Sequence, residues 1–257
     1  MSALTLALLV LAAFAAGWVD AVVGGGGLLQ LPALLIGLPP DTPPASVLGT
    51  NKVSSIFGTA TSSVTYARKI RPDWRTVLPL VVAAAIGSAC GAELAKYLPR
   101  TYFTPIVLIA LIGVGLYTWR RPQLGLTSHR RHTGRAHYGW TAAIGLGVGV
   151  YDGFLGPGTG SFFVILLVGV LGYGFLEASA KAKIANLATN LAAIIVFALH
   201  GSVLWALGLT MGAANLLGGL LGARMALKHG NAFVRKVFLL VVAALILKLG
   251  YDTIQQL

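Results

Sequence analysis

An acidic residue and four consecutive glycines lie inside one of the most apolar stretches of the chain, WVDAVVGGGGLLQLP at residues 18–32. Asp20 is costly in apolar surroundings unless it is paired, and a glycine run is a poor helix former. A helix that starts after a break has unpaired N–H groups in its first turn, and these groups attract anions. The sequence therefore predicts a break with anion-binding capacity at the four glycines, Gly24, Gly25, Gly26 and Gly27.

A related stretch, GVYDGFLGPGTGSF, repeats this order of residues later in the chain. Asp152 precedes Gly156 and Gly158, and Thr159 and Ser161 add hydroxyl donors. Two such breaks would aim two helix N-termini at one central site. The alternative is that the glycines only let helices pack closely, as small residues do in membrane proteins.

Polar side chains also interrupt two other apolar stretches. A cation within a membrane span indicates a substrate or ion pathway, so Lys52 is the sharpest candidate ligand for an anion. The alternative is a lysine that snorkels from the first turns of its helix to the interface. The first set is Asn51, Lys52, Ser54 and Ser55, and the second is Asn186, Thr189 and Asn190. Residues three and four apart share a helix face, so the second set forms a polar stripe on its helix.

The sequence leaves two possible roles open for Asp20 and Asp152. Buried carboxyl groups can carry protons through a transporter. Carboxylates can also cap broken backbone by accepting hydrogen bonds from glycine N–H groups. Both aspartates precede a glycine-rich stretch by the same spacing, which favours the structural reading slightly.

Composition places these motifs in a membrane. Hydrophobic residues make up 56% of the 257 positions and charged residues only 10%, and the mean hydropathy is +0.82. These values are typical of an integral membrane protein. The net charge of +12 lies in short stretches between apolar segments, so lipid topology explains it and nucleic-acid binding is not expected. Cys90 is the single cysteine, and no metal, P-loop or nucleophile motif is present, so we expect neither a cofactor nor an enzyme.

Apolar segments of membrane-crossing or half-crossing length recur along the whole chain. The second set matches the first in the order of its aspartate, glycine, asparagine and tryptophan residues, which indicates duplication. The fold class predicted is an all-α polytopic membrane protein of two inverted repeats, each of about five helical segments, with broken or re-entrant helices at the glycine motifs. The segments expected lie at about 3–20, 28–38, 45–67, 76–98 and 102–119, and at about 138–155, 160–175, 182–200, 203–226 and 233–252.

Basic residues orient the two halves. If the chain enters and leaves the membrane on the same side at each glycine motif, nearly all connectors rich in Lys and Arg lie on the cytoplasmic side, as the positive-inside rule requires. Lys181 and Lys183 belong to one of these connectors in this reading, and both termini lie outside. Residues 1–120 then form the N-terminal repeat, 121–137 a basic cytoplasmic connector and 138–257 the inverted C-terminal repeat.

The glycine motif with Asp20, the GTNKVSS stretch around Lys52 and the second motif YDGFLGPGTGSF together resemble the TauE/SafE sulfite exporter family over essentially the full chain. This resemblance implies a multi-pass permease of the bacterial inner membrane that moves sulfite, an organosulfonate or a related small anion. Substrate would be held near the midplane by half-helix N-termini while the halves alternate in access. The second copy has no lysine beside Asn186, so the site is expected to be asymmetric.

Two other functions remain open from the sequence. One is a proton- or cation-linked carrier centred on Asp20 and Asp152, and the other is a membrane subunit without a substrate of its own. The sequence does not decide which anion is carried or in which direction. It also leaves open whether a proton or sodium ion is coupled to transport and whether the protein forms a homodimer. The lipid bilayer is the one partner that composition itself requires.

Overall fold

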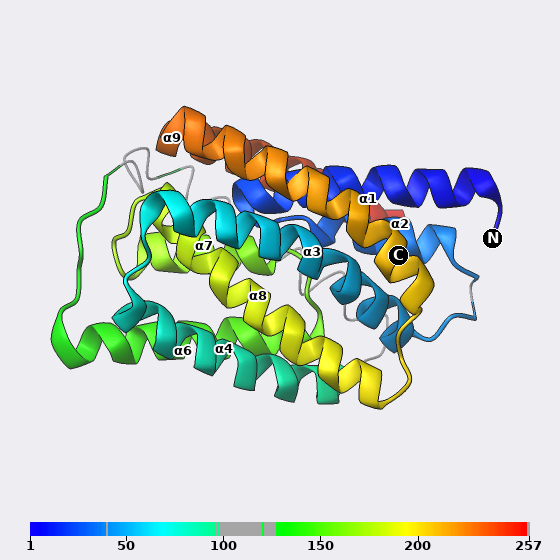
Figure 1. The fold of residues 1–257 in the computed structure, drawn as a ribbon, viewed down its shortest axis with the longest axis horizontal. Helices are drawn as coiled ribbons and strands as arrows, with labels where there is room; N and C mark the ends of the chain where they lie inside the picture. The colour runs from blue at the N-terminus through cyan, green and yellow to red at the C-terminus, as the bar shows by residue number, and fades with distance from the viewer. Residues whose placement is uncertain (40, 96, 98–119, 121–126, 256–257) are drawn as a thin grey trace.

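The computed structural model describes residues 1–39, 41–95, 97, 120 and 127–255, and these form helices joined by short loops (Figure 1). The expected segment at 102–119 lies outside the described residues, as does most of the connector that follows it. The described residues confirm the predicted all-α polytopic class. In chain order the helices are α1 (Ala3–Val23), α2 (Gly27–Gly37), α3 (Pro44–Ile70), α4 (Trp74–Ala95), α6 (Gly134–Phe154), α7 (Thr159–Gly169), α8 (Phe175–Leu199) and α9 (Trp205–Gln255).

Length and hydropathy single out helices that can cross a bilayer. Within the described residues, α1, α4, α8 and the Trp205–Leu240 part of α9 are long and apolar enough to do so. The helices that follow the two glycine motifs, α2 and α7, are each only 11 residues long. At 1.5 Å per residue each covers roughly 16 Å, about half the hydrocarbon thickness. Both glycine motifs therefore start short helices. The first has the length expected from the sequence, and the second is shorter than the expected segment at 160–175.

Three boundaries differ from those expected. The first is the start of α8 at Phe175, seven residues before the expected start, so that Lys181 and Lys183 lie within the helix and not in a connector. Hydropathy placed the start of the segment too late because it treats a lysine as solvated, whereas both lysines are buried here. The second is the start of α6 at Gly134, inside the expected connector. The third is the end of α7 at Gly169, six residues before the expected end at 175. The gap expected between 203–226 and 233–252 is confirmed, because α9 is interrupted inside it at Gly230 (φ 77°, ψ −169°).

The helices pack as two bundles, and neither bundle coincides with a half of the sequence. α1 and α3 pack against α9, with α2 at their side, and we call this the first bundle. α6 and α8 pack against α4, with α7 at their side, and this is the second bundle. Each bundle thus combines helices from both halves of the chain. The main contact between bundles is the crossing of α3 and α8.

Helix directions follow a regular scheme in Figure 1. α1 and α3 run from right to left, whereas the helices matched to them by sequence, α6 and α8, run from left to right. Similarly, α4 runs from left to right, and the first part of α9 runs the opposite way. Opposed directions in matched helices are what an inverted repeat predicts.

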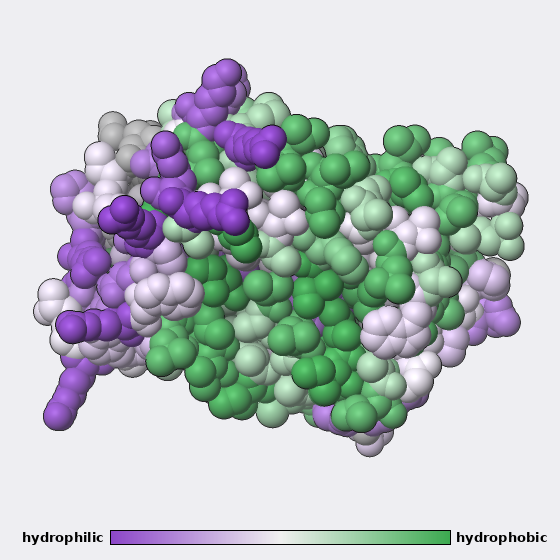
Figure 2. Space-filling model, viewed as in Figure 1, coloured by the Kyte–Doolittle hydropathy of each residue, from purple (hydrophilic) through white to green (hydrophobic). Residues whose placement is uncertain are grey.

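Polar and apolar surfaces are segregated along the molecule. Figure 2 shows hydrophobic residues across the middle and hydrophilic residues gathered at the left end. Several loops meet at that end: Arg130 lies 3.8 Å from Asp73 of the α3–α4 loop, and the Arg131 amide donates to Leu171 of the α7–α8 loop. Side chains such as Leu78, Ile86 and others on the outer faces are exposed, as a bilayer-facing surface requires. The basic loops therefore lie on one side of an apolar belt.

Candidate functional site

Two glycines in left-handed conformation end the helices that precede the breaks. Gly24 has φ 87° and Gly156 has φ 85°, and these two positions match in the sequence duplication. The amide of Gly24 donates to the carbonyl oxygen of Asp20, and that of Gly156 to the carbonyl oxygen of Tyr151. L-residues with side chains rarely adopt such angles, so glycine stops both helices at equivalent points. Beyond them the match ends, since Gly158 has φ 77° and Gly26 is right-handed.

The two breaks cross each other in direct backbone contact. The Ser161 amide donates to the carbonyl oxygen of Gly24 at 3.0 Å, and the Ser161 hydroxyl donates to the carbonyl oxygen of Val23 at 3.0 Å. A methyl group added to Gly24 would overlap the backbone of Gly160. Ser161 therefore fastens the start of α7 to the end of α1, and its hydroxyl is already used in this contact.

The short helices begin without side-chain caps. The residue before α2 is Gly26 and the residue before α7 is Gly158, and neither helix start has a side-chain cap hydrogen bond. The Thr159 hydroxyl turns back to the carbonyl oxygen of Gly156 at 2.8 Å and does not cap α7. The amides of Ser161 in α7 and of Leu28 in α2 already donate to main-chain oxygens. Only part of the positive end of each short helix is therefore left for a negative group.

The first of two buried ion pairs joins the bundles through Lys52. Its Nζ lies 2.6 Å from Oδ2 of Asp152, and the side chains are 3% and 1% exposed. Lys52 comes from the first third of α3, and Asp152 from the last turn of α6. Because Lys52 is buried and paired, it does not snorkel to the interface. The cation that the sequence singled out lies in the protein interior.

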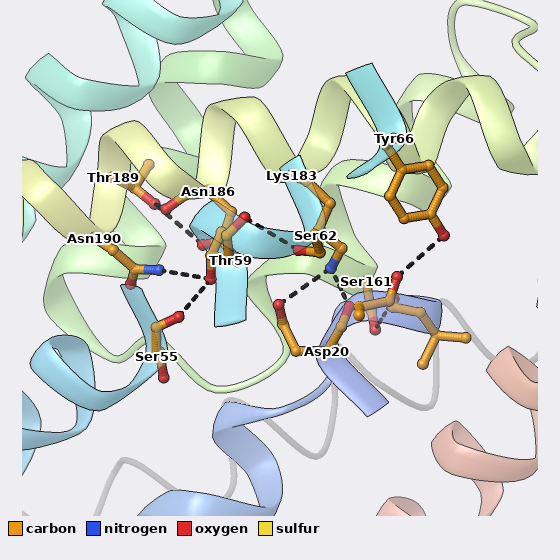
Figure 3. A network of polar contacts seen from close by, with 12 residues as sticks. Asp20, Ser55, Thr59, Ser62, Tyr66, Ser161, Lys183, Asn186, Thr189 and Asn190 are labelled. Carbon is orange, nitrogen blue, oxygen red and sulfur yellow. Dashed lines mark hydrogen bonds and ion pairs between the residues drawn. The ribbon is translucent and has the colours of Figure 1, made fainter. Parts of the chain in front are cut away.

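The second ion pair mirrors the first with the bundles exchanged. Lys183 of α8 lies 3.2 Å from Oδ2 of Asp20, with side-chain exposures of 0% and 15%. The same ammonium group also donates to the main-chain carbonyl oxygen of Asp20. Figure 3 shows Lys183 reaching down to Asp20, with the Tyr66 hydroxyl bonded to the neighbouring carbonyl group of Ala21.

These two ion pairs change two interpretations made from the sequence. The carboxylates of Asp20 and Asp152 pair with lysines, and the glycine amides that bond nearby use main-chain carbonyl oxygens instead. The second copy does have a lysine near Asn186, one turn earlier on the same helix face at Lys183. It was missed because Lys181 and Lys183 were assigned to the basic connector before this helix.

A small polar cavity of about 20 Å³ lies where the breaks and the two long helices meet. It has room for roughly one water molecule. Lys183 is not part of its wall, but Lys52 is. The lining residues are Asp20, Gly24, Gly27, Asn51, Lys52, Ser55, Asp152, Gly156, Gly158, Thr159, Gly160, Asn186 and Asn190.

Most candidate residues from the sequence are therefore brought together, and the others lie close by. Gly25 and Gly26 belong to the first break without lining the cavity. The Thr189 hydroxyl bonds within its own helix, to both oxygens of Asn186. Ser54 is fully buried, and its hydroxyl has no partner among the described residues.

Amide side chains complete the polar layer between the bundles. The Asn190 amide donates to the Thr59 hydroxyl at 3.3 Å and so links α8 to α3. Asn51 lines the cavity, is 3% exposed, and its Oδ1 has no hydrogen-bond partner in the described part of the chain. A buried polar atom without a partner is costly. Asn51 therefore offers an unused polar atom to whatever enters the cavity.

Two buried polar residues supporting this layer were not anticipated. Gln30 of α2 donates to the main-chain oxygen of Asn51 at 3.4 Å, and Asn215 of α9 donates to Gln30 at 3.0 Å. Gln30 is the one amide in an otherwise apolar 11-residue helix, and this contrast could have marked it. Asn215 is likewise the one amide in the apolar stretch MGAANLLGGLL at 211–221, although its partners depend on how α9 packs against α1.

The arrangement is suited to binding a small charged solute and has none of the groupings of a metal centre. No cluster of three or more His, Cys, Asp or Glu side chains that could hold a metal occurs among the described residues. The cavity instead combines an ammonium group, two carboxylates, amides and helix N-termini. These groups lie between two bundles within an apolar belt. Such a charged internal site defines the class of polytopic membrane transporters.

The chain belongs to the family named Sulfite exporter TauE/SafE, which it matches over residues 9–249. It is 37% identical over 248 residues to a probable membrane transporter protein, ORF9, of Sinorhizobium sp, covering 96% of this chain and 93% of the relative. It is 34% identical to a probable membrane transporter protein of Haemophilus influenzae, covering 96% and 95%. It is 33% identical to the probable membrane transporter protein YfcA of Escherichia coli K12, covering 98% and 92%. No solved structure matches the chain.

Proposed function

We propose that the protein is a secondary transporter that carries a small sulfur-containing anion, sulfite or an organosulfonate, across the bacterial cytoplasmic membrane. The family name supports the class of substrate, and the relatives in Sinorhizobium, Haemophilus and Escherichia are bacterial membrane transporters by name. A sulfur oxyanion presents several acceptor oxygens and no donor when fully ionised. It therefore suits a site built from an ammonium group, amides and helix N-termini.

The observation that carries the proposal is the position of Lys52. Its side chain is 3% exposed, it lines the polar cavity, and the uncapped start of α7 lines the same cavity. A buried cation in a membrane span is rare and marks a pathway. Lys52 and the helix N-terminus both attract an anion, and the carboxylates of Asp20 and Asp152 that line the same cavity are each balanced by a lysine.

Alternating access follows from how the bundles enclose this cavity. A space of about 20 Å³ is too small for a sulfur oxyanion, since it holds roughly one water molecule. The bundles must therefore separate for substrate to enter. We propose that they rock about the α3–α8 crossing, and that two inverted repeats make the outward-open and inward-open states equivalent. The opposed directions of matched helices support this symmetry.

Transport of labelled sulfite by protein reconstituted into liposomes tests the proposal. The informative variant is K52Q/D152N, which removes both charges together and leaves no uncompensated ion behind. We expect its flux to fall by at least about tenfold, since a charge-assisted hydrogen bond to the anion is lost. K69Q, which removes an exposed lysine at the end of α3, should retain wild-type flux. Wild-type protein that carries no sulfite, sulfonate or thiosulfate would contradict the proposal.

A further inference from the structure

The buried charges of the site cancel before any substrate arrives. Lys52 and Asp152 form one pair and Lys183 and Asp20 the other, so two ammonium groups face two carboxylates. Breaking a buried pair leaves an uncompensated charge, which is strongly unfavourable. If the proposed function is correct, an anion that binds Lys52 must displace a carboxylate that already lies 2.6 Å away. The site cannot gain an anion and keep the displaced carboxylate ionised without burying a net negative charge.

We propose that Asp152 takes up one proton when an anion binds Lys52, so that anion and proton cross the membrane together. This inference rests on the proposed function and adds the coupling ion to it. The proton comes from water and goes to the Asp152 carboxylate. The Lys52 ammonium group then exchanges its internal carboxylate partner for the substrate anion. For a monoanion the net charge of the site is zero both before and after binding.

The hydrogen bonds around Asp152 show why its charge depends on Lys52. The Ser88 hydroxyl lies 3.5 Å from Oδ2 of Asp152, but it also lies 2.8 Å from the carbonyl oxygen of Thr189. A hydroxyl group has one hydrogen to donate, and the shorter contact takes it. Once Lys52 has moved to an anion, the ionised Asp152 would lose its one strong partner. Protonated Asp152 could donate to Ser88, so protonation also resolves the hydrogen bonding.

The ion pair of Lys183 and Asp20 stays intact when an anion binds. Lys183 is fully buried, does not line the cavity and donates to both the carboxylate and the main-chain oxygen of Asp20. An anion would have to break two contacts to reach it. Asp20 therefore keeps its charge balanced by Lys183 throughout, and Asp152 is the carboxylate free to titrate with binding.

The groups that face Asp152 come from every element around it. Among the described residues, Lys52 is the one cationic side chain lining the cavity, and Asp20 is the other carboxylate. Tyr151, beside it on α6, donates to the carbonyl oxygen of Pro157 at 2.5 Å and is not positioned to serve as its proton donor. The facing groups are Lys52 from α3, Asp20 from α1, Ser88 from α4, Thr159 from α7 and Asn186 from α8, with Lys183 behind Asp20.

Binding of methanesulfonate at several pH values tests this proton linkage in the full chain. Methanesulfonate keeps its charge between about pH 5.5 and 8.5, unlike sulfite, so any pH dependence belongs to the protein. We expect wild-type affinity, read from thermal shift, to weaken by about tenfold per pH unit over the alkaline part of the range. D152N should bind with an affinity that no longer depends on pH, and the control D41N, which removes an exposed carboxylate outside the cavity, should retain the wild-type slope. A D152N protein that keeps the wild-type slope overturns the inference.

A second measurement needs no variant. In weakly buffered solution, saturating methanesulfonate should raise the pH by an amount equal to one proton taken up per protein molecule. Binding without proton uptake overturns the linkage and leaves anion transport standing. Folded wild-type protein that binds neither methanesulfonate nor sulfite at any pH in the range contradicts the proposed function itself. The two failures are therefore distinguishable.

Discussion

The two lysine–aspartate pairs are alike in chemistry and differ in what each lysine can reach. Lys52 touches the cavity and is held by one carboxylate. Lys183 lies away from the cavity and is held by two oxygens of the same residue. In the duplicated sequence the two lysines are offset by one helical turn relative to Asn51 and Asn186. An offset of one turn is thus enough to make one pair a candidate binding site and the other a fastening between bundles.

The strongest way to separate the pairs is to remove each lysine alone. K183Q should destabilise the protein by about 3–5 kcal/mol, since it leaves the Asp20 charge uncompensated in the interior. K52Q should cost less, because Lys52 contacts Asp152 through one carboxylate oxygen, whereas Lys183 contacts both the carboxylate and the main-chain oxygen of Asp20. Equilibrium unfolding in mixed detergent compares the two, and K183Q/D20N should recover part of the loss. Equal losses in K183Q and K52Q would remove the distinction between the pairs.

Alanine substitutions at Gly24 and Gly156, the two glycines in left-handed conformation, compare the two helix breaks. Each substitution forces a side chain into a conformation that costs about 1–2 kcal/mol. G24A should cost more than G156A, because its methyl group overlaps the Gly160 backbone, whereas the methyl group of G156A meets mainly the flexible end of Lys52. Thermal stability of the purified variants measures this order. G147A is the matched control, since nothing lies within 4 Å of a methyl group there.

Loss of one hydrogen bond across the α3–α8 crossing should have a smaller effect. N190A removes the donor to Thr59 at 3.3 Å and should lower the free energy of unfolding by about 1 kcal/mol. T210A removes a hydroxyl that bonds only within α9 at an exposed position and should be nearly neutral. If N190A is as neutral as T210A, this bond does not hold the bundles together.

The smallest effect is expected for the ion pair at the basic end of the molecule. Partial burial raises the pKa of Asp73, but hydrogen bonds from the Thr76 hydroxyl and the Arg75 amide, with the charge of Arg130, outweigh it and hold that pKa below its usual value. The stabilisation is therefore present at neutral pH and is lost as pH falls below about 4. D73N should cost less than about 1 kcal/mol at pH 7, because the pair is solvent-exposed. Melting curves at neutral and acidic pH check that the difference disappears in acid.

Much of the fold follows from local pattern, and the site follows only in part. Four glycines in an apolar segment cannot continue a helix, so the first break and the short α2 were predictable. The polar stripe of Asn186 and Asn190 was predictable because helical spacing alone sets a face. The charge pairing was not, since Lys52 meets Asp152 only through the contact between the two bundles, which no periodicity encodes. Lys183 was missed for a different reason, because hydropathy treats a buried, paired lysine as solvated.

Because each bundle combines helices from both halves of the chain, cutting the chain between the halves separates helices that pack together. α9 completes the bundle of α1 and α3, while α4 completes the bundle of α6 and α8. A fragment ending before the basic connector would leave α1 and α4 each facing lipid where a partner helix belongs, with Asp20 deprived of Lys183. The two fragments should accumulate in the membrane only when they are produced in the same cell.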